Sequence, residues 1–162
     1  MDKKLEKTVC FTGHRTIPES DFDRLNRALL QEIQKQIQNG AITFRTGGAR
    51  GFDTMAALAV LSLKKSNPHI RLSLMLPCPS QTNGWQKNDV EVYEQIKLCA
   101  DEVHYAASFY YNGILQIRNR HLVNGSDVCI AYLRNSSGGG TAYTCALALR
   151  EGLEFVNLQD KI

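Results

Sequence analysis

The chain has 162 residues, of which 43% are hydrophobic and 22% charged, enough for one domain with its own core. No apolar run approaches the roughly 18 residues of a membrane span, and residues 1–7 lack the apolar segment of a signal peptide. The five cysteines match neither a disulfide framework nor a metal-binding pair, and the net charge of +3 permits an anionic partner. We therefore expect a single cytoplasmic domain over residues 1–162, without membrane contact, metal site or required cofactor.

Short β-rich runs alternate with helical patterns along the whole chain. This alternation is typical of a parallel sheet that is covered by helices on both faces. We predict an α/β fold: a single Rossmann-like three-layer domain with a mostly parallel sheet of about six strands. Strands are predicted over residues 8–12, 41–45, 70–76, 102–105, 128–133 and 155–158, and helices over residues 21–38, 53–65, 89–98, 112–123 and 141–150.

The residues that follow the first predicted strand are the first candidates for a site, because ligands of open parallel sheets bind at the carboxyl ends of the strands. These residues are Gly13, His14 and Arg15. Gly13 allows the backbone to approach a ligand closely, His14 can shuttle a proton, and Arg15 can bind a phosphate through two hydrogen bonds. The alternative is a plain turn with solvated neighbours.

A glycine-rich turn follows the second predicted strand and opens the next helix. Free backbone N–H groups and the positive end of the helix dipole would face an anion at such a turn. Arg50 adds positive charge, and Asp53 either belongs to the site or is an ordinary helix N-cap. The pattern is neither a Walker A loop nor a complete dinucleotide-binding fingerprint. The candidate residues of this turn are Gly47, Gly48, Arg50, Gly51 and Asp53.

A second glycine-rich turn opens the last predicted helix. Three consecutive glycines carry a high entropic cost, which argues against a plain connector. The same anion-binding logic applies, with the hydroxyl group of Thr141 as an additional donor. Two such turns at one edge of a sheet indicate a ligand that lies across this edge. The candidate residues of the second turn are Gly138, Gly139, Gly140 and Thr141.

Three further side chains complete the set of candidates. Arg118 and Arg120 lie on the predicted helix before the fifth strand and could supply charge, although a solvated basic helix face is the alternative. Trp85 lies in the long loop over residues 77–88 and would either stack on a base or serve as a half-buried aromatic residue.

Taken in order, residues 13–15, 48–53, 118–120 and 138–141 resemble the SMF/DprA–LOG (SLOG) superfamily of Rossmann-like proteins. The chain looks most like the YpsA-like branch, a domain of unknown function, and the resemblance covers nearly the whole chain. It implies a bacterial protein and three functional precedents. The DprA branch binds single-stranded DNA, the LOG branch cleaves nucleoside monophosphates at the glycosidic bond, and the YpsA-like branch is associated with a nucleotide-like ligand. Related branches form homodimers, so a homodimer is also an expectation.

One position departs from the pattern of the LOG enzymes. These enzymes have a glutamate three residues beyond the Gly-Thr pair, where this chain has Thr144. A nucleotide N-glycosidase or phosphohydrolase would then need His14, Asp53 or Asp89 as its acid or base. The resemblance therefore favours binding of a small nucleotide-like ligand, with a sensor as one form of this function. The alternatives are the hydrolase and a DprA-like protein that binds single-stranded nucleic acid.

Overall fold

The computed structural model describes residues 6–135 and 138–162. Every predicted strand and helix is present, and their ends differ from the predicted ones by at most two residues. The elements are β1 (Lys7–Gly13), α1 (Glu19–Gln38), β2 (Ala41–Thr46), α2 (Phe52–Lys64), β3 (Arg71–Leu76), α3 (Lys87–Cys99), β4 (Glu102–Tyr105), α4 (Ile114–Val123), β5 (Val128–Tyr132), α5 (Gly139–Arg150), β6 (Glu154–Asn157) and the short 3-10 helix η2 (Leu158–Lys161).

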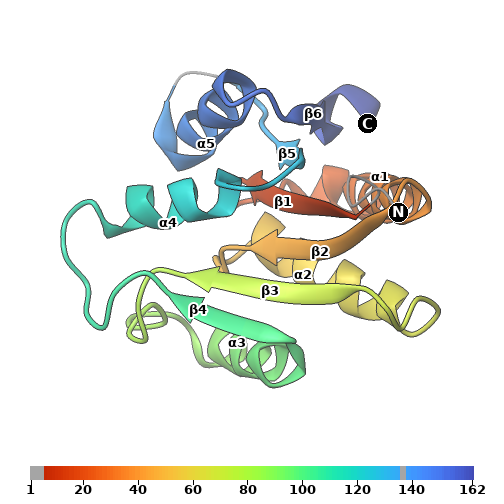
Figure 1. Cartoon of the computed structure of the whole chain (residues 1–162). Coiled ribbons are helices and arrows are strands. Elements are labelled where there is room, and N and C mark those ends of the chain that lie inside the picture. The colour runs from red at the N-terminus through yellow and green to blue at the C-terminus, as the bar shows by residue number, and fades with distance from the viewer. Residues whose placement is uncertain (1–5, 136–137) are drawn as a thin grey trace.

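The six strands form one sheet in the order β4-β3-β2-β1-β5-β6, and each neighbouring pair is parallel (Figure 1). The chain starts at β1, builds outward to β4, and then returns to place β5 on the other side of β1. The strand order therefore reverses between β1 and β5. In open α/β sheets, the crevice at such a switch point is the usual place for a ligand.

The helices cover both faces of the sheet, as the predicted three-layer fold requires. Helices α1, α2 and α3 pack side by side on one face, and α4 packs against α5 on the other. The larger core lies on the first face and includes the aromatic cluster of Phe11, Phe44 and Phe52. The smaller core lies on the second face and includes Cys10 and Cys129, which are neighbours on β1 and β5.

Local sequence patterns explain which elements are central. Helix α1 buries Leu25, Leu29 and Ile33, which recur every four residues and so form one apolar stripe. All five residues of β5 are buried, as expected of a strand that is covered on both faces. None of the helices formed by the described residues combines the length and apolar character needed to span a bilayer.

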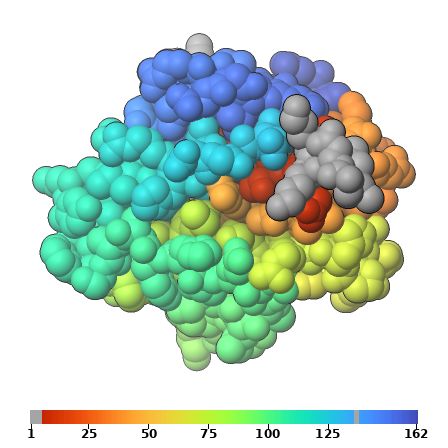
Figure 2. Space-filling view, viewed as in Figure 1, coloured from red at the N-terminus to blue at the C-terminus, as the bar shows by residue number. Residues whose placement is uncertain are grey.

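The carboxyl ends of the strands lie on the left in Figure 1, where the loop between β4 and α4 projects beyond the sheet. The space-filling view in Figure 2 shows the same segment, coloured green to teal, as the part of the surface that extends furthest on this side. The candidate residues that follow β1, β2 and β5 are therefore brought to one edge of the molecule.

Candidate functional site

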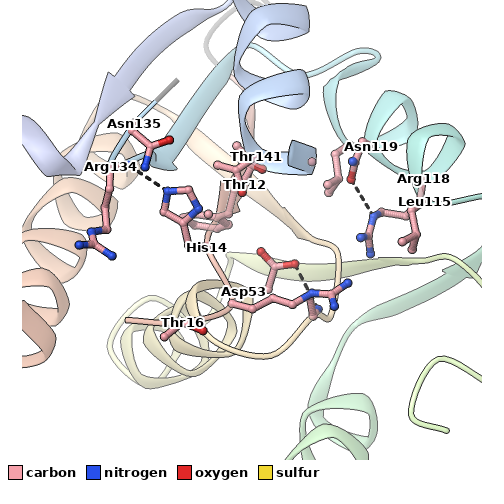
Figure 3. A pocket seen from close by; sticks show the side chains of 16 residues that line it. Thr12, His14, Thr16, Asp53, Leu115, Arg118, Asn119, Arg134, Asn135 and Thr141 are labelled. Atoms are coloured by element: carbon pink, nitrogen blue, oxygen red, sulfur yellow. Dashed lines mark hydrogen bonds between the residues drawn. The ribbon is translucent and has the colours of Figure 1, made fainter. Parts of the chain in front are cut away.

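A cavity of about 520 Å³ lies at the carboxyl edge of the sheet, next to the switch point between β1 and β5 (Figure 3). We call it the first chamber. Its volume is typical of a site for a small molecule. It brings together seven of the residues predicted from the sequence: Gly13, His14, Arg15, Asp53, Arg118, Gly140 and Thr141.

His14 is held in one orientation in the wall of the first chamber. Its Nε2 atom accepts a hydrogen bond of 2.9 Å from the backbone N–H of Arg134, and its ring meets Tyr132 edge-on. Partial burial, and then the positive charge of Arg134, lower the pKa of His14. The imidazole is therefore neutral at pH 7, with its proton on Nδ1, so that it can donate a hydrogen bond but carries no charge.

Asp53 is a buried carboxylate in the wall of the same chamber. Gly51 occupies the N-cap position of α2, so the alternative that Asp53 is the N-cap is wrong. The Oδ2 atom of Asp53 instead accepts a hydrogen bond of 3.1 Å from the backbone N–H of Ala49. Burial raises the pKa of Asp53 to about 6, against the opposing positive charges of Arg118 and Arg15. The chamber thus holds a carboxylate that gains a proton only slightly below neutral pH.

Arg118 connects α4 to the turn between β2 and α2. Only 6% of the residue is exposed, so a solvated basic face does not describe it. Its Nη1 atom donates to the carbonyl oxygen of Gly47, and its Nε atom donates to Oδ1 of Asn119 at 2.9 Å. Burial lowers the pKa of Arg118, and the negative charge of Asp53 counteracts this effect. A guanidinium group has such a high reference pKa that Arg118 remains charged in the chamber wall.

The glycine turn after β2 is filled by groups of the protein itself. The backbone N–H of Gly48 donates to Oγ1 of Thr46 at 3.3 Å, and the N–H of Ala49 is taken by Asp53. A Cβ atom on Gly47 would collide with the guanidinium of Arg118, and one on Gly48 would collide with Leu76. These glycines therefore serve close packing inside the protein, and the turn is not an open anion site.

No described residue fills the space beside the glycines of the turn before α5. Gly138 and Gly139 have φ angles of 128° and 92°, and a Cβ atom on either would meet no described atom within 4 Å. The next two residues, Gly140 and Thr141, line the first chamber. The first N–H groups of a helix have no acceptor within the helix, and the helix dipole makes this end positive. The start of α5 therefore presents the positive end of a helix to the first chamber.

A second cavity, of about 530 Å³, adjoins the first. We call it the second chamber. Arg15, Ala49 and Leu115 line both cavities. The second chamber also contains two predicted residues, Arg50 and Trp85, whose side chains stack with the guanidinium carbon 4.9 Å from the ring centre. The predicted site residues are thus divided between two adjoining spaces.

Some predicted residues lie outside both chambers. Arg120 is exposed on α4, and Asp89 lines a third cavity, of about 300 Å³, together with Phe22. Thr144, at the position of the LOG glutamate, is fully buried and donates its hydroxyl hydrogen to the carbonyl oxygen of Gly140 at 2.9 Å. The remaining predicted residues that line neither chamber are the turn glycines Gly47, Gly48, Gly51, Gly138 and Gly139.

Sequence reasoning missed five polar residues of the first chamber. Arg134 and Asn135 lie in the loop after β5, so the rule that led to the candidates after β1 and β2 could have found them as well. Thr12, Thr16 and Asn119 are each next to a predicted residue. Within residues 6–135 and 138–162, no group of three or more His, Cys, Asp and Glu side chains is arranged to hold a metal ion.

The fold and the cavity at the switch point define a Rossmann-like protein. One solved structure with a similar fold is that of DNA processing protein A from Helicobacter pylori, which describes its single-stranded DNA binding mode. The superposition has a TM-score of 0.64 and 21% sequence identity, and it covers 95% of this chain and 67% of that chain. At this identity, the similarity establishes the fold.

The model of the YspA SLOG family matches residues 11–154, and the chain belongs to this family. A UPF0398 protein of Halalkalibacterium halodurans is 30% identical over 151 residues, which covers 88% of this chain and 80% of that protein. A UPF0398 protein of Bacillus thuringiensis is 23% identical over 155 residues, which covers 90% and 84%. The superfamily and branch that the sequence motifs indicated are therefore confirmed, and these relatives are bacterial.

Proposed function

We propose that this protein binds a nucleotide-derived ligand, with its phosphate at the start of α5 in the first chamber. The observation that carries the proposal is the meeting of an open helix N-terminus, at Gly140 and Thr141, with the arginines of the same cavity. Backbone N–H groups at a helix start, together with the helix dipole, form a ready-made binding site for phosphate. The helix dipole contributes about 0.3–1 kcal/mol at an exposed terminus and up to about 2 kcal/mol where the site is partly buried.

The other walls of the first chamber are suited to the uncharged part of a nucleotide. The carboxylate of Asp53 accepts hydrogen bonds and can receive them from the hydroxyl groups of a ribose. The Nδ1–H group of His14 is a neutral donor that the Arg134 backbone holds in place. Because Asp53 carries a charge above pH 6 and His14 does not, the phosphate is expected to lie at the α5 end of the chamber, away from Asp53.

The test uses Gly140→Glu, with Gly140→Gln as the matched control of nearly equal size. A Cβ atom at this position lies 3.7 Å from Nδ2 of Asn119, an ordinary contact, so both variants are expected to fold. A carboxylate at a helix start is favourable for the helix but competes with phosphate for the same N–H groups. We expect Gly140→Glu to lose binding of adenosine monophosphate and Gly140→Gln to retain most of it.

Calorimetric titration and thermal denaturation measure this effect. A ligand at 100 times its Kd stabilises the folded state by about 2.7 kcal/mol, which raises the Tm by roughly 5–10 °C in a chain of this size. If no nucleotide stabilises the wild type at millimolar concentration, or if Gly140→Glu binds as well as Gly140→Gln, the proposed phosphate site is wrong.

A second candidate function is binding of single-stranded nucleic acid, and the loop between β4 and α4 favours it. Phe109 and Tyr110 are 64% and 57% exposed there, and Tyr110 lines the second chamber. Exposed aromatic rings next to basic side chains are the usual platform for stacked bases. The structural neighbour from Helicobacter pylori is a protein with a described single-stranded DNA binding mode.

Fluorescence anisotropy with a labelled 20-nucleotide single strand tests this second function. If it holds, the affinity falls steeply as the salt concentration rises, because phosphate contacts release counterions. Phe109→Ala combined with Tyr110→Ala should then weaken binding, whereas Gly140→Glu should affect it less. Absence of binding at low salt, or an affinity that does not change with salt, would rule out this function.

A further inference from the structure

The second chamber is too large and too different to be a simple extension of a phosphate site. Its volume of about 530 Å³ equals that of the first chamber, and either space alone is in the range of a complete small-molecule site. The two spaces join at Arg15, Ala49 and Leu115, which line both of them. A molecule in the first chamber can therefore extend past Arg15 into the second without a change in the fold.

The walls of the second chamber are suited to a flat aromatic ring. The guanidinium of Arg50 lies over the ring of Trp85, and the edge-to-face contact with Tyr93 holds this ring from another side. The Nε atom of Arg50 is buried and has no hydrogen-bond partner among the described residues. Tyr110, which is exposed, adds a second aromatic ring to the lining beside the half-buried Trp85. Stacked guanidinium and aromatic planes are surfaces on which nucleobases bind.

We propose that the second chamber binds an aromatic ring of the same ligand, so that the ligand carries two ring-bearing groups joined by phosphate. One nucleoside would lie in the first chamber, the bridging phosphates between α5 and Arg15, and the other ring on the Arg50–Trp85 pair. This inference rests on the proposed phosphate site at the start of α5. It adds the class of ligand: a dinucleotide-type molecule instead of a mononucleotide.

A small two-ring ligand fits the charge of the molecule better than a continuous nucleic-acid strand. The sequence pI is about 8.6, whereas dedicated nucleic-acid-binding domains commonly have a pI above about 9. Of the arginines that line the chambers, only Arg15 lines both, so positive charge lies at their junction. A ligand whose phosphates bridge two ring-bearing groups would place its negative charge there.

The experiment compares affinities by calorimetry for adenosine monophosphate, NAD, diadenosine diphosphate and a 20-nucleotide single strand. We expect at least one of the two bridged molecules to bind about 10-fold or more tightly than adenosine monophosphate. Trp85→Leu should lower this ratio about 5-fold or more, to a value near 1, because one stacked base contributes about 1–3 kcal/mol. Trp85→Phe keeps a ring at the position and should preserve most of the ratio.

Each other result contradicts the inference in a distinct way. If the mononucleotide binds as tightly as both bridged molecules, the second chamber takes no part, while the phosphate site stands. If Trp85→Leu weakens all ligands equally, Trp85 has a structural role only. If only the 20-nucleotide single strand binds, the two chambers form a nucleic-acid interface and the inference is wrong. If no ligand binds, or if Gly140→Glu does not affect binding, the phosphate site itself has failed and the inference fails with it.

Discussion

The two glycine-rich turns of this protein look alike in the sequence but differ in what surrounds them. In the turn after β2, Arg118 and Leu76 occupy the space that side chains on Gly47 and Gly48 would need. In the turn before α5, the space beside Gly138 and Gly139 contains no described atom within 4 Å. A glycine of the first kind is required by the protein interior. A glycine of the second kind is required only by its backbone conformation, and it leaves room for a ligand.

This difference teaches that a glycine-rich turn at a helix start does not by itself define an anion site. What decides is whether the backbone N–H groups have already found acceptors. Asp53 takes this role in the first turn, since its carboxylate accepts from Ala49 at 3.1 Å. The turn after β2 thus already binds the carboxylate of Asp53, whereas the start of α5 faces the first chamber.

The largest expected effect on stability is that of replacing glycine by alanine in the turn after β2. The same replacement in the turn before α5 should cost less. Gly51→Ala would combine a φ angle of 80° with a collision against the backbone of Arg15, so we expect a loss of about 3–5 kcal/mol in the free energy of unfolding. Gly139→Ala carries backbone strain only, and its expected cost is about 1–2 kcal/mol. Urea denaturation of both variants measures the difference. Equal losses would contradict the distinction between a packed and an open turn.

The next effect concerns the arginine that fills the first turn. Arg118→Met removes the hydrogen bonds to Gly47 and Asn119 and leaves the buried charge of Asp53 less compensated, at an expected cost of about 3 kcal/mol. In the background of Asp53→Asn, the same substitution should cost about 1 kcal/mol less, because the buried charge is absent. A double-mutant cycle of urea denaturation measures this coupling. Strictly additive losses would show that the two side chains do not interact.

The pH dependence of stability follows from the raised pKa of Asp53. Because the native carboxyl group has a pKa of about 6 and the reference value is 3.8, the folded state binds more protons than the unfolded state between these values. Stability should therefore fall as the pH rises from about 4 to about 6 and then stay constant, by on the order of 2–3 kcal/mol. Asp53→Asn keeps an acceptor for Ala49 and should remove this component. Parallel pH profiles of wild type and variant would refute the assignment.

The smallest expected effect has the opposite sign. Gly140→Ala places a Cβ atom 3.7 Å from Nδ2 of Asn119, within the first turn of α5. Alanine is the better helix former, so we expect the free energy of unfolding to increase by about 0.5–1 kcal/mol. Thermal denaturation measures this gain. A clear loss of stability would mean that the turn before α5 is packed more closely than the structure shows.

Much of this fold could be predicted from the sequence because its elements are local patterns. The alternation of strands and helices, and the apolar stripe of α1, need no tertiary information. The strand order cannot be predicted without tertiary information, because the residue pattern of β5 does not indicate that this strand pairs with β1 rather than with β4. The boundary of α5 differs from the prediction because glycine is a poor helix former, so the sequence places the glycines before the helix, whereas Gly139 and Gly140 belong to its first turn.

Part of the site could also be predicted from local sequence, namely the residues that follow a predicted strand. Residues after β1 and before α5 were found because ligand sites follow strand ends. The closure of the turn after β2 could not be foreseen, since it depends on Arg118, which reaches Gly47 from a position 71 residues further along the chain. The division into two chambers likewise depends on where the loop containing Trp85 folds back onto Arg50.

The pairing of β1 with β5 also has a consequence for folding. His14 and Thr141 are separated by most of the chain, yet the first chamber needs both of them, and they meet only when β5 has joined β1. Contacts of such large sequence separation are the slow step in forming a sheet. A chain that has formed β1 to β4 alone would have no complete first chamber. A ligand that binds the complete first chamber would therefore stabilise the pairing of β5 with β1.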